Sequence, residues 1–355
     1  MKKICFIINS LGGGGAERVI SVLASNLCNL YEVSIILLIH NNFIAYDIDP
    51  KVHIHQLNKY SNKIHQLFKT PLDLSRKMND VNADLYISFC TMENVMSLLA
   101  NKKVKKKLII CERNSPKTER INQIFKILRK VLYHKANRYI FQTNDAKKYY
   151  SKNIQKRSYI IPNPVKDNLP DAIYNPTKKI CSVGRLFEQK NYPLLITSFS
   201  QFLKIYPDYY LEIYGKGDDE VKLKKLVSDL NISPKVTFKG FSQNVHECIK
   251  DAEIFIMSSD YEGMPNALLE ALTMGLPCIS SDCPVGGPKE LIDNNINGLL
   301  FKVGDSADLL DKMLYFASHD KERIQMGMKA KEIKNKYSTN KISKMWVSVI
   351  EEMVN

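Results

Sequence analysis

Residues 3–19 read KICFIINSLGGGGAERV: an apolar run of strand length, four consecutive glycines, and then the start of a helical pattern. Similar short apolar runs predict further strands at residues 32–39, 85–89, 108–111 and 138–142. Short buried strands that alternate with helices are typical of a parallel sheet covered on both faces. The first half of the chain is therefore predicted to form a doubly wound α/β domain.

The alternation stops at residues 160–165, IIPNPV, where two prolines remove backbone donors and fix φ, as in a linker. It then restarts, with strands predicted at residues 179–183, 210–214, 235–239, 254–257 and 278–281, and helices at 193–205, 220–230, 245–251, 265–274 and 307–317. Two such units predict two Rossmann-like parallel-sheet domains whose strand ends face a shared cleft. We place their bounds at residues 1–163 together with a C-terminal helix, 338–355, and at residues 164–337.

The chain has 355 residues, a two-domain length, and its 45% hydrophobic and 25% charged residues are ordinary for a globular protein. Its longest apolar runs are far shorter than the ~18 residues that a membrane span needs. The first apolar run is also too short for a secretory signal. Eight cysteines include no Cys-x-x-Cys pair. These features predict a reduced, cytoplasmic protein.

The formal net charge of +14 lies entirely in the first half. Residues 1–165 carry 27 Lys or Arg and 11 Asp or Glu, whereas residues 166–355 carry 24 and 26. The densest basic residues are Lys102, Lys103, Lys105, Lys106, Lys107, Lys126, Arg129 and Lys130. The last three flank an apolar stripe at helical spacing, so the helix either lies on an anionic membrane surface or packs its stripe on the sheet. No zinc-finger, helix-turn-helix or aromatic-interleaved basic pattern favours nucleic acid.

The glycine run before the first helix favours close approach of a phosphate, with Gly14 and Gly15 nearest the helix N-terminus. A dinucleotide-binding fingerprint would need a third glycine at the position of Glu17 or Arg18, and an acidic residue after the second strand. Both are absent, and no Gly-Lys-Ser/Thr follows, so dehydrogenases and Walker-loop enzymes are disfavoured. A purely structural tight turn is the remaining alternative.

Two motifs in the second half place charge at predicted strand ends. The first, SVGRLFEQKN (residues 182–191), offers Arg185 and Lys190, suited to phosphate oxygens. The second is SSDYEGMPNALLEA, residues 258–271. Here Glu262 and Glu270 flank a helix start, about 12 Å apart along the helix axis. The candidate diphosphate amides between them belong to Asn266, Ala267 and Leu268. A carboxylate accepts paired hydrogen bonds from a vicinal diol, so this layout suits the sugar, diphosphate and ribose of a nucleotide-sugar.

These residues together resemble the retaining glycosyltransferases of family 4, which have the GT-B architecture. The resemblance covers nearly the whole chain and rests on Gly-Gly-Ala-Glu-Arg-Val (14–19), Ile-Pro-Asn (161–163), Gly-Arg-x4-Lys-Asn (184–191) and Glu-x7-Glu (262–270). It implies that Arg185 and Lys190 neutralise the donor diphosphate. It also implies that Glu262 holds a sugar hydroxyl and Glu270 the ribose diol.

The resemblance extends to smaller details. It implies that Gly14 and Gly15 contact the donor, that Phe241 lies near the base, and that the helix after Tyr337 crosses back to the first domain. Many relatives carry a histidine near the donor sugar after the fourth strand, where this chain has Glu112 and Arg113. Either residue is a candidate sugar or acceptor contact.

A finer resemblance, through the stretch at residues 281–290, is to enzymes that extend bacterial surface glycans on undecaprenyl diphosphate, such as N-acetylgalactosaminyltransferases. This chain has one more residue than the commonest form of that signature. The resemblance implies a UDP-sugar donor, a polyprenyl-diphosphate-linked glycan acceptor, no metal or other cofactor, and a peripheral position on the inner face of the cytoplasmic membrane. Two alternatives keep the fold: a UDP-sugar epimerase, and a non-catalytic nucleotide-sugar-binding protein.

Overall fold

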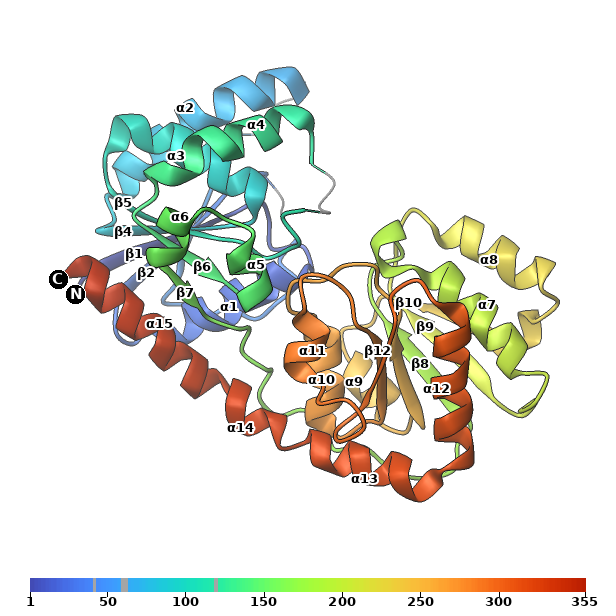
Figure 1. Ribbon diagram of the computed structural model, residues 1–355. Coiled ribbons are helices and arrows are strands. Elements are labelled where there is room, and N and C mark those ends of the chain that lie inside the picture. The colour runs from blue at the N-terminus through green and yellow to red at the C-terminus, as the bar shows by residue number, and fades with distance from the viewer. Residues whose placement is uncertain (41–42, 59–62, 118–120) are drawn as a thin grey trace. The chain divides into compact units, whose positions relative to one another are not determined.

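The computed structural model describes residues 1–40, 43–58, 63–117 and 121–355. The chain divides into two compact units. Unit 1 comprises Met1–Pro164 and Thr339–Asn355, and unit 2 comprises Val165–Ser338. Each unit holds one parallel sheet with helices on it (Figure 1).

The sheet of unit 1 has seven strands in the order β3-β2-β1-β4-β5-β6-β7, all paired in parallel. The strands are β1 (Lys3–Ile8), β2 (Glu32–Leu37), β3 (His53–Gln56), β4 (Leu85–Phe89), β5 (Lys107–Cys111), β6 (Arg138–Phe141) and β7 (Ser158–Ile160). The central strand β4 is buried along its whole length, and β1 is buried after its first residue. Burial on both faces explains why these strands are continuous apolar runs.

Helices cover both faces of this sheet, with α2, α3 and α4 on one side and α1 and α15 on the other (Figure 1). The helices are α1 (Gly15–Leu27), α2 (Lys63–Val81), α3 (Thr91–Val104), α4 (Gln123–Leu132), η1 (Tyr133–Lys135), α5 (Asn144–Lys148), α6 (Lys152–Lys156) and α15 (Thr339–Val354). The C-terminal helix α15 is part of unit 1 because Trp346, fully buried, stacks on Phe89 with ring centroids 5.8 Å apart.

The sheet of unit 2 has six parallel strands in the order β10-β9-β8-β11-β12-β13. They are β8 (Lys179–Val183), β9 (Tyr210–Tyr214), β10 (Val236–Gly240), β11 (Ile254–Met257), β12 (Cys278–Ser281) and β13 (Leu299–Phe301). One hydrophobic cluster joins β8, β9 and β11 to α7 and α12, through residues such as Ile213, Phe199 and Phe316.

The helices of unit 2 follow the strands in alternation. They are η2 (Glu188–Lys190), α7 (Tyr192–Phe202), α8 (Glu220–Asp229), η3 (Ser233–Lys235), α9 (Val245–Ile249), α10 (Asn266–Met274), α11 (Gly287–Leu291), α12 (Ser306–Ser318), α13 (Asp320–Ala330) and α14 (Ile333–Tyr337). Pro265 is the N-cap of α10, one residue earlier than the first turn where the sequence placed it.

The prediction of two Rossmann-like parallel sheets is confirmed, and each strand predicted from an apolar run is present. The sequence missed the edge strands β3 and β13. It also missed the helices α2, α3, α5, α6, α11, α13 and α14. Strand β3, His53–Gln56, is exposed or half-buried throughout, so its sequence has no apolar run to reveal it. Strand β13 has only three residues, too few to show a period.

Candidate functional site

The strand order of unit 2 reverses at β8, which has β9 on one side and β11 on the other. In open α/β sheets, ligands bind beside the carboxyl ends of the strands at such a reversal. The two motifs singled out in the second half of the sequence follow these two neighbouring strands. Residues 184–191 follow β8, and residues 258–265 connect β11 to α10. The fold therefore brings together segments about 70 residues apart in sequence.

Lys190 and Glu262 form an ion pair across this reversal, with Nζ and Oε1 2.6 Å apart. Their side chains are only 18% and 10% exposed. A half-buried pair of this kind is screened by solvent much less than a surface pair. Lys190 is also the predicted diphosphate ligand, and Glu262 is the predicted sugar ligand. Both members of the ion pair are therefore expected to contact the donor.

Hydrogen bonds tie the loops around this pair to one another. The side chain of Asn191 donates to Asp260 Oδ1 over 2.7 Å, and Ser258 Oγ donates to the carbonyl of Lys190 over 2.8 Å. The backbone of Glu262 exchanges two hydrogen bonds with the connection after β12, through Pro284 and Val285. Glu262 is therefore held from both sides by backbone and side-chain bonds, which fixes the position of its carboxylate.

Arg185 lies at the start of the loop that follows β8. It is exposed, and its guanidinium is 5.5 Å from the ring centroid of Phe187. No carboxylate among the described residues pairs with it. The loop approaches its neighbour closely: Gly215, at φ +141°, sits so near the carbonyl of Gly184 that a Cβ there would lie 1.9 Å from that oxygen. Only glycine fits at Gly215, which allows the β8 and β9 loops to meet.

Glu270, in the second turn of α10, pairs with His246 of α9. The Nε2–H of His246 donates to Glu270 Oε2 over 2.8 Å, and the two side chains are 12% and 9% exposed. Sequence reasoning missed His246. A single histidine in a five-residue helix carries no spacing signal, and its nearness to Glu270 arises only when β10 and β11 take their places in the sheet.

The remaining predicted donor residues lie near these pairs along the chain. Asn266, Ala267 and Leu268 form the first turn of α10, at the end of the helix where the helix dipole favours an anion. Phe241 follows β10 directly and is 51% exposed, so its ring is available for stacking. These roles stay predictions.

In the glycine loop of unit 1, two backbone amides already donate hydrogen bonds to a side chain of the helix that follows, Glu17. Glu17 Oε2 accepts hydrogen bonds from the amides of Gly13 and Gly14 over 2.5 and 2.7 Å, while Ser10 Oγ donates to Oε1 over 2.9 Å. The amide of Gly14 predicted for the donor is thus used in capping α1. Gly15 is the first residue of that helix and is exposed.

Glu112 is placed in the interior of unit 1, not at a surface, because side chains of α3 and η1 cover the end of β5. It is 3% exposed and accepts hydrogen bonds from Thr91, Asn94 and the hydroxyl of Tyr133. Burial and the neighbouring Glu112 carboxylate raise the pKa of Tyr133 well above its usual value. The expectation of a sugar or acceptor contact from Glu112 is therefore not favoured by its position.

Arg113 is half-buried between aromatic rings. Its guanidinium lies 4.1 Å from the centroid of Phe89 and 5.8 Å from that of Trp346. Nη1 donates to Asn163 Oδ1 over 3.1 Å. Burial lowers the pKa of the Arg113 guanidinium from its usual value. Arg113 thus joins the end of β5 to the segment after β7 and to α15, all within unit 1.

The residues of the predicted basic surface lie in two places, at the end of α3 and on α4, and one of them, Arg129, is buried. Lys102, Lys103, Lys105, Lys106 and Lys107 run from the end of α3 into the start of β5 and are exposed or half-buried. They lie at the amino edge of the sheet, opposite the glycine loop. On α4, Lys130 is exposed and Lys126 half-buried, but Arg129 is 6% exposed. Arg129 donates to the carbonyl of Pro116 over 2.7 Å, so it does not belong to the surface predicted for it.

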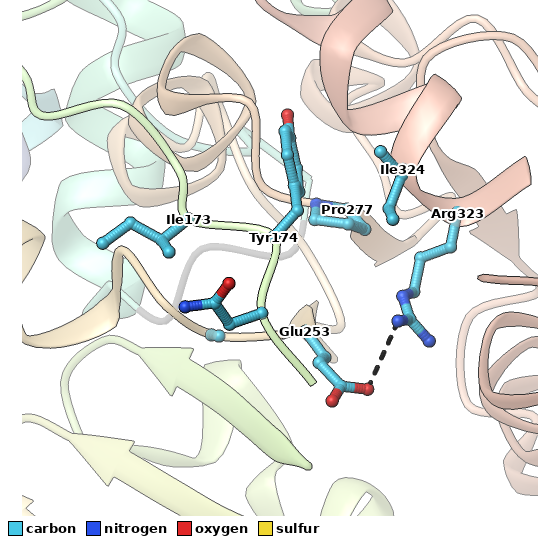
Figure 2. A pocket seen from close by; sticks show the side chains of 8 residues that line it. Ile173, Tyr174, Glu253, Pro277, Arg323 and Ile324 are labelled. Carbon is cyan, nitrogen blue, oxygen red and sulfur yellow. Dashed lines mark ion pairs between the residues drawn. The ribbon is translucent and has the colours of Figure 1, made fainter. Parts of the chain in front are cut away.

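A small cavity in unit 2 lies apart from these residues (Figure 2). Its volume is about 10 Å³, and its lining includes Tyr174, Pro277 and the ion pair of Arg323 with Glu253, whose N and O atoms are 3.4 Å apart. Glu253 precedes β11, so the cavity is at the amino edge of the sheet. Its size suits about one water molecule, not a substrate.

Comparison with known proteins identifies the class. Residues 169–333, nearly all of unit 2, match the family described as "Glycosyl transferases group 1". The protein is a glycosyltransferase. More particularly, its second unit is a group 1 glycosyltransferase domain, and its two Rossmann-like units give it the GT-B fold.

Two Campylobacter jejuni enzymes resemble the whole chain. One is named GalNAc-alpha-(1->4)-GalNAc-alpha-(1->3)-diNAcBac-PP-undecaprenol alpha-1,4-N-acetyl-D-galactosaminyltransferase; it is 29% identical and the match covers 100% of both chains. The other is N-acetylgalactosamine-N,N'-diacetylbacillosaminyl-diphospho-undecaprenol 4-alpha-N-acetylgalactosaminyltransferase, 29% identical over 97% of this chain and 98% of the relative.

Solved structures agree on the fold. Anabaena Alr3699/HepE, in complex with UDP and glucose, has a TM-score of 0.84 at 16% identity, covering 99% of this chain and 100% of the other. Sucrose-phosphate synthase from Thermosynechococcus elongatus has a TM-score of 0.87 at 16% identity, covering 99% of each chain. Identities this low establish the shared fold alone.

Within the described ranges, no helix combines the length and apolar character that crossing a membrane requires. Across the same residues, no three His, Cys, Asp or Glu side chains are grouped as metal ligands would be.

Proposed function

We propose that this glycosyltransferase transfers a hexose or N-acetylhexosamine, with retention of anomeric configuration, from a UDP-sugar to a glycan linked to undecaprenyl diphosphate. The observation that carries the donor half is the Lys190–Glu262 pair at the reversal point of the unit 2 sheet. The acceptor half is supported by the two full-length relatives, whose names specify glycans on undecaprenyl diphosphate.

The diphosphate is assigned to the start of α10, between Glu262 and Glu270. Arg185 brings an exposed guanidinium without a carboxylate partner among the described residues, and Lys190 brings an ammonium now shared with Glu262. A dianionic phosphate group competes with a single carboxylate for the same ammonium. When the donor binds, Lys190 therefore turns from Glu262 toward the diphosphate, and Glu262 becomes available to a sugar hydroxyl.

The reaction then breaks the bond between the anomeric carbon and the UDP oxygen and forms one from that carbon to the acceptor oxygen. Negative charge grows on the leaving phosphate, where Arg185, Lys190 and the α10 amides stabilise it. The acceptor hydroxyl attacks from the face that UDP leaves and gives its proton to a phosphate oxygen. The products are UDP and the extended glycan, and neither a metal nor a covalent enzyme intermediate is required.

Helix α4 supports an acceptor held at a membrane. The sequence grouped its apolar residues into one stripe, but the structure divides them between two faces. Phe125 and Leu132 are buried against unit 1, whereas Ile124, Ile127 and Val131 are 51%, 62% and 54% exposed. Their spacing of three and four residues puts these last three on one outward face.

The outward face of α4 combines apolar and basic side chains, because Lys126 and Lys130 lie beside Ile127 on the same helix. Anionic lipid attracts the lysines, and the isoleucines enter the boundary between head groups and acyl chains. We infer that this face rests on the inner leaflet of the bacterial cytoplasmic membrane. Ile127→Glu should reduce sedimentation with phosphatidylglycerol liposomes while leaving UDP binding unchanged.

The decisive experiment incubates the protein with a panel of UDP-sugars and undecaprenyl-diphosphate-linked acceptors, followed by linkage analysis of the product. The proposal expects one UDP-sugar to be consumed only when acceptor is present, giving an α-linked product from an α-linked donor, with EDTA having no effect. Conversion of a UDP-sugar without acceptor would establish the epimerase instead. Donor binding without turnover across the panel would establish a non-catalytic nucleotide-sugar-binding protein.

A further inference from the structure

The nucleoside end of the donor site is built from two elements that are separate in sequence. The connection from β10 to α9 carries the exposed ring of Phe241, and α10 carries Glu270. A side-chain hydrogen bond joins the two elements: the Nε2–H of His246, in α9, donates to Glu270 Oε2 over 2.8 Å. Both partners are largely buried, at 12% and 9% exposed.

A glutamate that binds a vicinal diol must present its carboxylate in one orientation. The side chain has three rotatable bonds, and holding it still costs conformational entropy each time a ligand binds. A hydrogen bond from a ring with only two rotatable bonds removes that cost beforehand. Bonds to an ionised carboxylate are also stronger than neutral ones. Pairing with His246 therefore preorganises Glu270.

We propose that His246 is a positioning residue that holds the Glu270 carboxylate in the orientation in which it accepts both hydroxyls of the donor ribose. The proposal rests on the proposed function, which assigns the ribose to Glu270. His246 acts through Glu270 and does not itself touch the nucleotide.

The neutral imidazole is sufficient for this role. A carboxylate only accepts hydrogen bonds, so the ring must carry its proton on Nε2, and no positive charge is needed. Glutamine places its amide nitrogen where His246 has Nε2, so His246→Gln keeps the donor, while His246→Ala removes it. The two variants together distinguish the effect of the hydrogen bond from the effect of the ring's volume.

The test compares UDP with 2′,3′-dideoxy-UDP, which lacks the diol, by titration calorimetry of the full-length protein. Wild type should prefer UDP. His246→Ala should weaken UDP binding about tenfold, or ~1.4 kcal/mol, and leave dideoxy-UDP binding unchanged. His246→Gln should keep most of the preference. In a Glu270→Gln background, His246→Ala should have no further effect on UDP. His319→Ala, an exposed histidine of the same unit, is the matched control.

The outcomes are distinguishable. If wild type binds the two nucleotides equally, the assignment of the ribose to Glu270 fails, and the positioning role fails with it. If wild type prefers UDP to dideoxy-UDP and His246→Ala shows the same preference, Glu270 keeps its role and the proposal for His246 is overturned. Equal weakening of both nucleotides in His246→Ala, with a lowered Tm, would show that the histidine serves only the fold; His246→Gln checks this because it leaves the ring site filled.

Discussion

Glutamates at strand ends have different surroundings in the two units. In unit 2, Glu262 and Glu270 each meet a side chain from a separate loop or helix, Lys190 and His246 respectively. In unit 1, Glu112 is 3% exposed and accepts hydrogen bonds from neutral donors, including Asn94 and Tyr133. A pair at the edge of a site can release its cation to a phosphate, as proposed for Lys190, or hold its carboxylate in place for a diol, as proposed for His246. A carboxylate enclosed by neutral donors cannot leave them without exposing a buried charge. The comparison indicates that the side chain that contacts a glutamate, more than the glutamate itself, distinguishes a candidate binding residue from a structural one.

The strongest test of this difference is Lys190→Ala. Loss of a charge that stabilises the leaving group should lower kcat by about 10²- to 10³-fold, as for a removed oxyanion donor. The rate of UDP release with the preferred sugar donor measures it. Lys222→Ala, on the 83% exposed lysine of α8, is the matched control. A kcat within about twofold of wild type would remove Lys190 from the catalytic machinery.

Glu112→Gln tests whether the buried carboxylate of unit 1 serves the stability of the fold. The new amide nitrogen faces side chains that donate, so the free energy of unfolding should fall by about 3 kcal/mol in urea titrations. UDP binding, which the proposed function assigns to unit 2, should not change. Glu32→Gln, at a 43% exposed surface pair with Lys3, should alter stability by less than about 0.5 kcal/mol. A stable Glu112→Gln protein that had lost transfer activity would reverse the assignment and restore Glu112 as a substrate contact.

The charge of unit 1 can be tested on α4. Lys126→Ala combined with Lys130→Ala should weaken binding to anionic liposomes by about 2 kcal/mol, roughly thirtyfold, since each lysine near the surface contributes ~1 kcal/mol. Added salt should reduce the difference from wild type. The same double change at Lys222 and Lys225 of unit 2 should have no effect. Binding that ignored both anionic lipid and the two lysines would contradict a membrane face on α4.

The smallest expected effect concerns the anchoring of α15. Hydrogen bonds from Tyr159 and Arg138 hold the pKa of Glu352 below its usual value. Because the folded pKa lies below the unfolded one, the resulting stability is present above the unfolded pKa and is lost as pH falls through the folded pKa. Melting curves from pH 7 down to about pH 3 should therefore show wild type losing its advantage over Glu352→Gln. A difference in Tm between wild type and Glu352→Gln that stayed constant with pH would exclude this linkage. Glu332→Gln, at the N-cap of α14, is the control.

Much of the site was predictable because strands buried on both faces must be apolar runs, and ligand residues follow such runs at their carboxyl ends. The positions of Arg185, Lys190, Glu262 and Glu270 beside the strand ends were predicted in this way, and their roles in binding stay predictions. His246 was not, since a lone histidine has no period and no motif. Arg129 was placed on the surface because helical spacing gives the angle between residues but does not say which face packs. The same spacing merged Ile124 and Val131 with Phe125, which the structure separates.

The sequence by itself determined the alternation of elements, the two parallel sheets, and the segments that end at their carboxyl edges, because local patterning and backbone geometry depend only on near neighbours along the chain. Only the tertiary structure decided which side chains meet: Lys190 with Glu262 across 72 residues, His246 with Glu270, and Glu17 with the amides of its own glycine loop. Those contacts depend on strand order and on burial, which arise when distant segments pack together. They decide which carboxylates meet a lysine or a histidine and which are enclosed by neutral donors.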